Sequence, residues 1–365
     1  MIAFLGFMFA TAVAQGPDPQ AARDLSERAR QLYDEARYSE AEPLYRQAIE
    51  AWSGLGPEAA QDRAIDRRNL GAVLRTTGRY HEAEPLLTDS LRELEAAGAD
   101  VMEVERALFN LASLYRSEGD LAKAESFGLR AAGLIEKRSD IPVPERQGPR
   151  LILASIYLEQ HRYAEAERIL NAALEGADGA IAVAAYNGLT IAAIARSEYP
   201  QAEALARKAL YFAGMALPAG HPGVAAAWNN LAQACRFQGK YLEAEKAYRV
   251  AIGVWEDTLG PSHPHVAQGL MNLGAFYHER GREAGAEALY TRAAGILEQT
   301  FGKDDPRTLA ARNEVAEILR AERRYAESEK LGRSTLAGLK KALRPDDPRV
   351  VRAQSNYARL EATRK

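Results

Sequence analysis

The sequence has little cysteine and histidine, with one Cys and six His, and it carries none of the common catalytic motifs. Its 365 residues include one cysteine, Cys235, which excludes an intramolecular disulfide framework and a zinc site built from cysteine thiolates. It also lacks a serine nucleophile elbow, a phosphate-binding loop and a zinc-helix signature. The formal net charge is only −3, so the overall field favours neither nucleic acid nor an anionic membrane as a partner. These absences predict a protein that is not an enzyme and that holds no cofactor and no metal.

The N-terminus carries an apolar run. Residues 2–14 are apolar and close with Ala12-Val13-Ala14 before a polar stretch, which is the pattern of a hydrophobic segment followed by a small-residue cleavage site. The run is too short to span a bilayer comfortably, and no Lys or Arg precedes it. We expect a cleaved signal peptide over residues 1–14 and a periplasmic or secreted protein. The alternatives are an uncleaved anchor and a disordered tail, and without a signal the protein would be cytoplasmic.

A period of 42 residues runs through the second half of the chain. Pairs of His or Asp with Pro recur at this interval, at His221-Pro222, His263-Pro264, Asp305-Pro306 and Asp347-Pro348. A second pair keeps nearly the same interval along the whole chain, at Ala41-Glu42, Ala83-Glu84, Ala124-Glu125, Ala166-Glu167, Ala202-Glu203, Ala244-Glu245, Ala286-Glu287 and Ser328-Glu329. Self-similarity at such a period is typical of a solenoid, in which each unit buries its apolar face by stacking on its neighbours.

Each unit predicts two helices. In the unit that begins near Trp228, apolar residues follow at helical spacing, and Gly239-Lys240-Tyr241 separates them from a second such run. The glycine fits a turn that needs a left-handed backbone. In the later units, His or Asp stands where a helix N-cap is expected, and Pro stands at the first helical position.

The pattern therefore predicts an all-α solenoid over residues 15–365, made of about eight helix pairs and a C-terminal capping helix. The expected pairs span residues 20–55, 62–97, 103–137, 145–175, 181–217, 222–259, 264–301 and 306–343, with the cap at 348–365. Three prolines between Arg138 and Pro149 predict an irregular connection. The step from Ala166 to Ala202 is 36 residues instead of 42, so we expect a short fourth unit and a possible bend at 138–182.

The units resemble tetratricopeptide repeats. Trp-x2-Leu-Ala-x2-Cys from Trp228, followed by Ala-x3-Tyr from Ala244, fits that pattern with Cys235 in the usual Tyr position. HEAT-type repeats have a similar period, but the Gly-x-Tyr turn and the Ala-Glu pair favour tetratricopeptide units. Residues 221–349 are similar more narrowly to the kinesin-light-chain subtype, through Trp228-Asn229-Asn230-Leu231-Ala232, residues 238–245 and Leu259-Gly260-Pro261-Ser262-His263-Pro264.

This resemblance implies a right-handed superhelix with a concave groove lined by the first helices of the pairs. It does not imply motor function, because no heptad-repeat segment precedes the units. An export signal would also contradict such a function.

Two columns of polar residues recur along the first helices. Fourteen residues before the Ala-Glu alanine lies an asparagine column, and six residues further lies a basic column. Their members are Asn69, Asn110, Asn230 and Asn272, and Arg75, Arg116, Arg236, His278 and Arg320. In the resembled family, side chains at such positions face the groove and hold extended peptides. Amides both donate and accept hydrogen bonds, and Arg can capture a carboxylate bidentately. The alternative is that the asparagines stabilise packing and the arginines solvate a helix face.

The fourth and fifth units interrupt both columns. They place Ile152, Leu158, Gly188 and Ile194 at the corresponding positions. We therefore expect an apolar middle flanked by two basic ends, which would favour a ligand with acidic residues around an apolar centre.

Other candidates have simpler interpretations. His263 and His265 could form a metal pair, but His221 and Asp305 replace His263 in the neighbouring units, which favours helix capping. Cys235 occupies a core column and is expected to be buried. The Glu of the Ala-Glu pair recurs in every unit, which favours a surface or inter-repeat role over acid–base catalysis.

The leading hypothesis is a non-catalytic scaffold that holds an extended, acidic and apolar segment of a partner protein in its groove. The alternative is a regulatory or targeting subunit of an enzyme or envelope-assembly complex, docked through the outer face. A third possibility, an enzyme with its site in the bent centre, has no motif in its favour. Expected partners are proteins or peptides and not nucleic acid, with no stable membrane span after cleavage. The sequence does not specify the oligomeric state.

Overall fold

The computed structural model describes residues 18–35, 37–136, 138, 140–142, 146–175, 177 and 179–363. Over these residues it contains 17 α-helices, one short 3-10 helix, η1 (Pro57–Ala59), and no strand. The predicted signal segment at residues 1–14 lies outside this part of the chain. None of the described helices is both long enough and apolar enough to cross a membrane.

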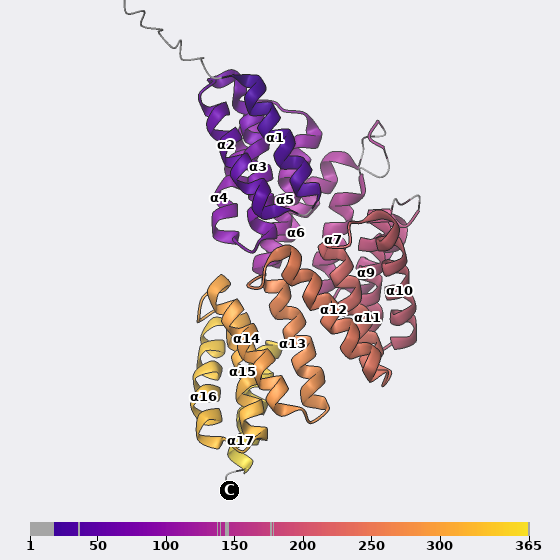
Figure 1. Ribbon diagram of the computed structural model, residues 1–365, viewed down its shortest axis with the longest axis vertical. Helices are drawn as coiled ribbons and strands as arrows, with labels where there is room; N and C mark the ends of the chain where they lie inside the picture. The colour runs from indigo at the N-terminus through magenta and orange to yellow at the C-terminus, as the bar shows by residue number, and fades with distance from the viewer. Residues whose placement is uncertain are drawn as a thin grey trace, which may run out of the picture.

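The helices form eight consecutive pairs and one closing helix (Figure 1). The first four pairs are α1 (Pro19–Asp34) with α2 (Tyr38–Ser53), α3 (Ala60–Thr76) with α4 (Tyr80–Ala96), α5 (Val101–Glu118) with α6 (Leu121–Ile135), and α7 (Gln147–Glu159) with α8 (Tyr163–Ala173). The last four are α9 (Gly179–Ala195) with α10 (Tyr199–Ala216), α11 (Pro222–Phe237) with α12 (Tyr241–Leu259), α13 (Pro264–Glu279) with α14 (Glu283–Phe301), and α15 (Pro306–Ala321) with α16 (Tyr325–Ala342). Helix α17 (Pro348–Thr363) packs on α15 and α16.

These bounds confirm the all-α solenoid. The fifth unit is a regular pair of 17 and 18 residues, and the shortest helix is α8, with 11 residues, in the unit whose step along the sequence is short. The bend expected at 138–182 stays a prediction.

A residue with a left-handed backbone ends the first helix of most pairs. Glycine fills this position in four pairs, at Gly78, Gly119, Gly239 and Gly281. In three other pairs a residue with a side chain takes it, with φ of 61° at His161, 62° at Ser197 and 64° at Arg323. Such a conformation strains an L-residue, so packing of the two helices imposes the turn even where glycine is missing.

The His-Pro and Asp-Pro pairs begin helices, as their spacing predicts. The His221 and His263 rings each accept a hydrogen bond from the backbone N–H two residues on, at 3.0 Å. The Asp305 and Asp347 carboxylates do the same at 2.8 and 2.9 Å. Their recurrence is therefore explained by helix capping.

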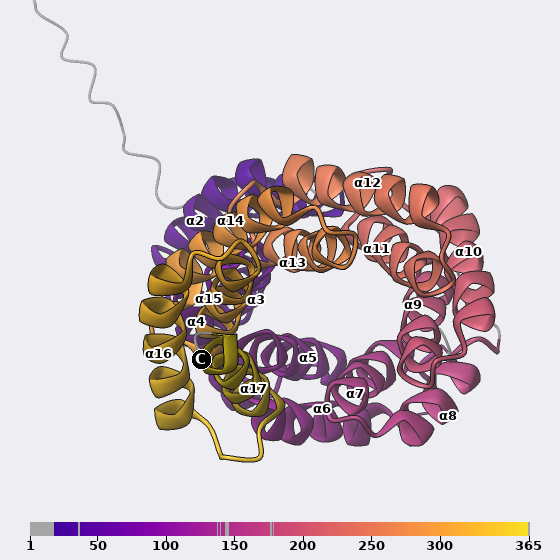
Figure 2. The ribbon, with the colours of Figure 1, turned by 90° about the horizontal axis from the view of Figure 1, so that it is seen from below.

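The solenoid curves into a ring when it is viewed along its axis (Figure 2). Helices α3, α5, α7, α9, α11, α13, α15 and α17 lie on the inside of this ring, and the second helices of the pairs lie on the outside. The chain continues past one full turn, so that α13 to α15 lie beside the N-terminal pairs in both views.

Contacts between the two turns hold the ring together, and we call them the seam. The seam joins the α3–α4 turn and the end of α5 to the loops that precede α13 and α15. The rings of Tyr80 and Phe301 stack with centroids 5.5 Å apart. The Arg307 guanidinium lies 3.2 Å from the Phe301 centroid and donates to the Ser117 carbonyl at 2.8 Å, across 190 residues of sequence.

The loop before α13 completes the seam. Pro264, the first residue of α13, lies so close to Gly78 that a Cβ on that glycine would be 2.9 Å from the proline Cδ. His263 is 3% exposed, and this burial lowers its pKa to about 3. Leu259 and Phe301 pack against the core of the N-terminal pairs. Both side chains, from the sixth and seventh pairs, also pack against the core of the C-terminal pairs, so they connect the two cores.

Candidate binding surface

We define the inner face as the exposed part of the first helices. Their outer sides are covered by the second helices and their flanks by neighbouring first helices, so side chains that stay exposed in mid-helix point to the inside of the ring. Ile191 in α9 is 42% exposed, and Gln268 in α13 is exposed as well. The inner face is therefore accessible on both α9 and α13.

The asparagine column lies between successive first helices. The Asn272 amide donates to the Asn229 side-chain oxygen at 2.9 Å, and Asn230, only 5% exposed, lies 3.4 Å from the Asn187 oxygen. These amides link α9 to α11 and α11 to α13. Sequence reasoning missed Asn187 and Asn229, which stand one residue before the predicted column.

In the N-terminal pairs the same column is less connected. Asn69 accepts hydrogen bonds from the adjacent Arg68 guanidinium at 3.1 and 3.3 Å. Asn110 is half-buried. No hydrogen bond among the described residues joins either amide to a neighbouring first helix.

Most of the basic column already has acidic partners. The pairs are Arg116 with Glu159 at 2.6 Å, Arg236 with Glu279 at 2.7 Å, His278 with Glu283 at 2.6 Å, and Arg320 with Glu317 at 2.8 Å. Arg75 is the exception, because no carboxylate of the described residues lies within 4 Å of its guanidinium. The Arg75 Nε is buried without a hydrogen-bond partner, and its Nη2 reaches only the Thr76 hydroxyl at 3.4 Å.

The seam adds a third basic side chain beside Arg75 and Arg116. His265 follows His263 in α13, and their rings lie 4.9 Å apart. Burial and the positive charges of Arg116 and Arg75 lower the pKa of His265, although part of this residue stays accessible to solvent. We call Arg75, Arg116 and His265 the basic cluster. Sequence reasoning considered His265 only as a metal ligand and missed its place beside Arg75 and Arg116, because only the curvature of the whole solenoid brings α13 next to α3 and α5.

The residues that were predicted to form an apolar middle of the groove are buried, and a different residue is exposed there. Ile152 and Leu158 are each 6% exposed and pack into the core. Gly188 is buried against Leu170. A large apolar side chain that is exposed on this part of the inner face is Ile191, three residues after Gly188, which stands at the position of the asparagine column.

The repeated Glu of the Ala-Glu pair ties each unit to the next. In five units it accepts from an Arg or Lys that stands 37 residues later, just before the second helix. The pairs are Arg79 with Glu42, Arg162 with Glu125, Lys240 with Glu203, Arg282 with Glu245 and Arg324 with Glu287. The predicted inter-repeat role is confirmed, and the recurring cation after the turn was the signal that sequence reasoning overlooked.

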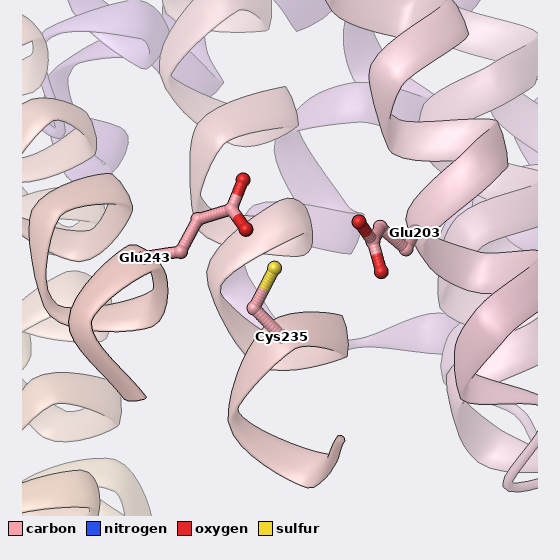
Figure 3. Close-up of side chains that lie close together, drawn as sticks. All are labelled: Glu203, Cys235 and Glu243. Atoms are coloured by element: carbon pink, nitrogen blue, oxygen red, sulfur yellow. The ribbon is translucent and has the colours of Figure 1, made fainter. Parts of the chain in front are cut away.

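One cluster outside the inner face has atoms that could hold a metal ion. Potential ligand atoms of Glu203, Cys235 and Glu243 lie within 4.8 Å of one another (Figure 3). However, Lys240 donates to Glu203 and lowers its pKa to about 2, and Gln238 donates to the same carboxylate at 2.8 Å. Burial raises the pKa of Cys235 to about 11, so its thiol stays protonated at neutral pH. Packing and the salt bridge account for this cluster.

Comparison with known proteins agrees with the architecture. A family model described as tetratricopeptide repeat matches residues 20–92, 62–137, 223–299 and 265–341. No curated protein matches the chain in sequence. A solved Rap protein complexed with competence and sporulation factor is 15% identical, with 95% of this chain and 98% of that chain covered and a TM-score of 0.59.

Two further solved structures share the fold. The Cut9-Hcn1 hetero-tetramer of APC/C is 11% identical, with 92% of this chain and 55% of that chain covered and a TM-score of 0.61. A signal-transduction ATPase with a tetratricopeptide repeat sensor from Pyrococcus horikoshii is 15% identical, with 88% and 50% covered and a TM-score of 0.54. The family matches together cover residues 20–137 and 223–341, more than half of the sequence. The chain therefore belongs to the tetratricopeptide repeat family.

Proposed function

We propose that the protein is a non-catalytic scaffold whose inner face holds an extended segment of a partner protein. The accessible first helices support this proposal, since solenoids present such surfaces to their partners. The similar Rap structure was solved with competence and sporulation factor, and the Cut9 structure with Hcn1, so this fold accommodates other chains in both cases.

The observation that carries the proposal is the unpaired charge of Arg75. An incoming carboxylate can bind it without displacing a carboxylate of the protein, whereas the rest of the basic column would first have to give up its own partner. Arg116 can contribute by exchanging Glu159, which is 42% exposed at its side chain. Ile191 offers an apolar contact farther round the ring. The proposed ligand therefore carries acidic residues next to an apolar one.

Binding of a synthetic peptide with acidic residues next to an apolar one tests this function. We expect the double variant Arg75→Glu and Arg116→Glu to abolish binding, because it reverses the charge of the basic cluster. The matched control is Arg292→Glu on the outer helix α14, where the arginine pairs with Glu256. Unchanged affinity in the double variant, measured by fluorescence anisotropy, would contradict the proposal.

Docking through the outer face is the second candidate, and one observation favours it. Tyr211 and Met215 on α10 are 65% and 61% exposed, which is unusual for apolar side chains so close together. We expect Tyr211→Glu with Met215→Glu to release partners captured in a pull-down if this face docks an enzyme or an assembly complex. If the inner face is responsible, only the substitutions at Arg75 and Arg116 release them.

We also propose that residues 1–14 direct export and are removed. The expected outcome is a protein that begins near Gln15 in the periplasm or the medium. N-terminal sequencing of the native protein checks it, and Met1 retained on cytoplasmic protein would refute it.

A further inference from the structure

The turn that the seam covers has an uncovered counterpart in the sixth pair. Gly78 and Gly239 have φ of +80° and +78°, and each is followed two residues later by a tyrosine. Tyr80 is only 7% exposed because it is covered by Phe301, whereas Tyr241 is 41% exposed. The same Gly-x-Tyr turn therefore occurs in the second and sixth pairs, and only the one in the second pair is covered.

Apolar side chains gather around the uncovered turn, and we call Tyr199, Phe237, Tyr241 and Leu242 the turn patch. Phe237 is 46% exposed and Leu242 is 90% exposed. The Tyr199 ring stacks on Phe237 at 4.8 Å, and the Arg280 guanidinium lies 4.2 Å from the Tyr241 centroid. Because these contacts already fix the aromatic rings, a partner that covers them loses little conformational entropy in the process.

The loop that covers Tyr80 also has an uncovered counterpart, 42 residues later. Leu343 corresponds to Phe301, and Asp347-Pro348-Arg349 repeats Asp305-Pro306-Arg307. The Arg349 guanidinium holds Asp347 with bonds of 3.0 and 2.9 Å, and Arg307 holds Asp305 with bonds of 2.9 and 3.0 Å. Figure 2 shows the loop between α16 and α17 projecting outward from the ring. Its residues 344–346 are exposed.

We propose that this loop, residues 343–349, docks on the turn patch of a second copy of the chain and there reproduces the seam. Leu343 would cover Tyr241, as Phe301 covers Tyr80. Arg349 would reach the end of α13, where Glu279 stands at the position that Ser117 has in α5. The Glu279 side chain is 51% exposed and pairs with Arg236, so it offers Arg349 a carboxylate that Ser117 does not offer Arg307.

The loop of one copy cannot reach the turn patch of the same copy. Helices α10, α11 and α12, which carry the turn patch, lie across the ring from the loop between α16 and α17 (Figure 2). The two docking surfaces also differ from each other, so the contact is heterologous. Copies joined in this way form a head-to-tail chain, not a symmetric dimer.

Sedimentation velocity of the full chain over a range of concentrations tests the association. We expect the weight-average mass to rise with concentration, and Leu242→Asp to weaken the association by at least about tenfold, because it places a charge in the apolar turn patch beside the Tyr241 ring that Leu343 would cover. Arg349→Ala should weaken it too. The matched controls are Leu129→Asp, on an exposed leucine of α6, and Arg92→Ala, on an exposed arginine of α4. A chain that stays monomeric, or one whose association survives Leu242→Asp, would overturn the proposal.

Site-specific crosslinking identifies the contact itself. The native Cys235 is buried, so introduced cysteines are the reactive ones. A Leu242→Cys copy mixed with an Arg349→Cys copy should give a crosslinked pair when a short bis-maleimide is added. A Leu129→Cys copy mixed with the Arg349→Cys copy should give none. Self-association without the crosslink between positions 242 and 349 would refute this contact.

Discussion

At the scale of single residues, buried polar side chains fix how neighbouring helices meet. Asp66 in α3 is 2% exposed and accepts hydrogen bonds from the Ser26 hydroxyl of α1 and the Trp52 indole of α2, the latter at 2.7 Å. Burial raises the pKa of Asp66 to about 6, although the two donors oppose the shift. One carboxyl group thus holds three helices together, because each donor would be left unsatisfied without it.

Arg323 offers a test of the strain in the turns. It is exposed, has a φ of 64°, and stands where other pairs have glycine. Arg323→Gly removes the steric cost of the left-handed backbone, about 1 to 2 kcal/mol, but adds freedom to the unfolded chain, about 0.5 to 1 kcal/mol. We therefore expect a net gain of about 0.5 kcal/mol in the free energy of unfolding by urea. Arg323→Ala keeps the Cβ, so it should gain nothing, and an equal gain from both variants would disprove the explanation.

At the scale of elements, local patterns specify most of the structure. The apolar spacing, the Gly-x-Tyr turns and the Pro caps act within one unit or between neighbours, and they predicted the helix pairs. The same holds for part of the candidate site. Arg116 with Glu159 and Arg236 with Glu279 are each 43 residues apart, so the column could have been recognised as paired from the sequence. The contact of Arg307 with Ser117 could not, because it depends on curvature accumulated over several units.

Substitution by alanine should have opposite effects on the free energy of unfolding at two glycines that lie in helices. A Cβ on Gly332 in α16 would lie 3.4 Å from Tyr357 and 3.9 Å from Ala316, which are ordinary contacts at the edge of a small pocket between α15, α16 and α17. A Cβ on Gly71 in α3 would lie 2.6 Å from the Cδ2 of Leu87, a fully buried side chain. We expect Gly332→Ala to raise the free energy of unfolding by about 0.5 to 1 kcal/mol through helix propensity.

Gly71→Ala should instead lower the free energy of unfolding by about 1 to 3 kcal/mol, because Leu87 must move within a packed core. Urea denaturation of the two variants checks both signs. Stabilisation by Gly71→Ala would show that the first helix of the second pair has more room than its contacts indicate.

At the scale of the whole molecule, the seam turns a row of units into a closed ring. Units of a solenoid normally contact only their neighbours, so a change in the stability of one unit has little effect on the stability of a distant unit. Here Phe301 and Leu259 belong to the surroundings of the N-terminal core. The seam therefore couples the α3 and α5 ends of the inner face, which carry Arg75 and Arg116, to the loops before α13 and α15. A conformational change in the C-terminal pairs can therefore alter the positions of Arg75 and Arg116 in the proposed peptide site through the seam.

Acid should weaken the seam through His263. Its folded pKa of about 3 lies well below the value of 6.5 expected in an unfolded chain, so between these values the unfolded or opened state binds a proton that the closed seam does not. The contribution of the neutral ring is complete above pH 6.5 and is lost as the pH falls toward 3. The groups that face it are Arg75, which opposes protonation, the neighbouring His265, and the Thr76 carbonyl, which favours it.

Hydrogen exchange at the α3–α4 turn measures this effect where it occurs. We expect the protection of the Gly78 and Arg79 amides to fall between pH 6.5 and 4.5 once the intrinsic pH dependence of exchange is removed. His263→Asn keeps a side chain that can cap α13 but carries no titrating ring, so its protection should change less over this range. His221→Asn is the matched control, since His221 caps α11 in the same way but takes no part in the seam. Asp66 and Glu105 cannot explain a loss of protection in acid, because burial raises their pKa values to about 6 and about 7, so acid favours their folded, protonated forms. If acid lowers protection equally in the protein and in His263→Asn, groups other than His263 control the seam.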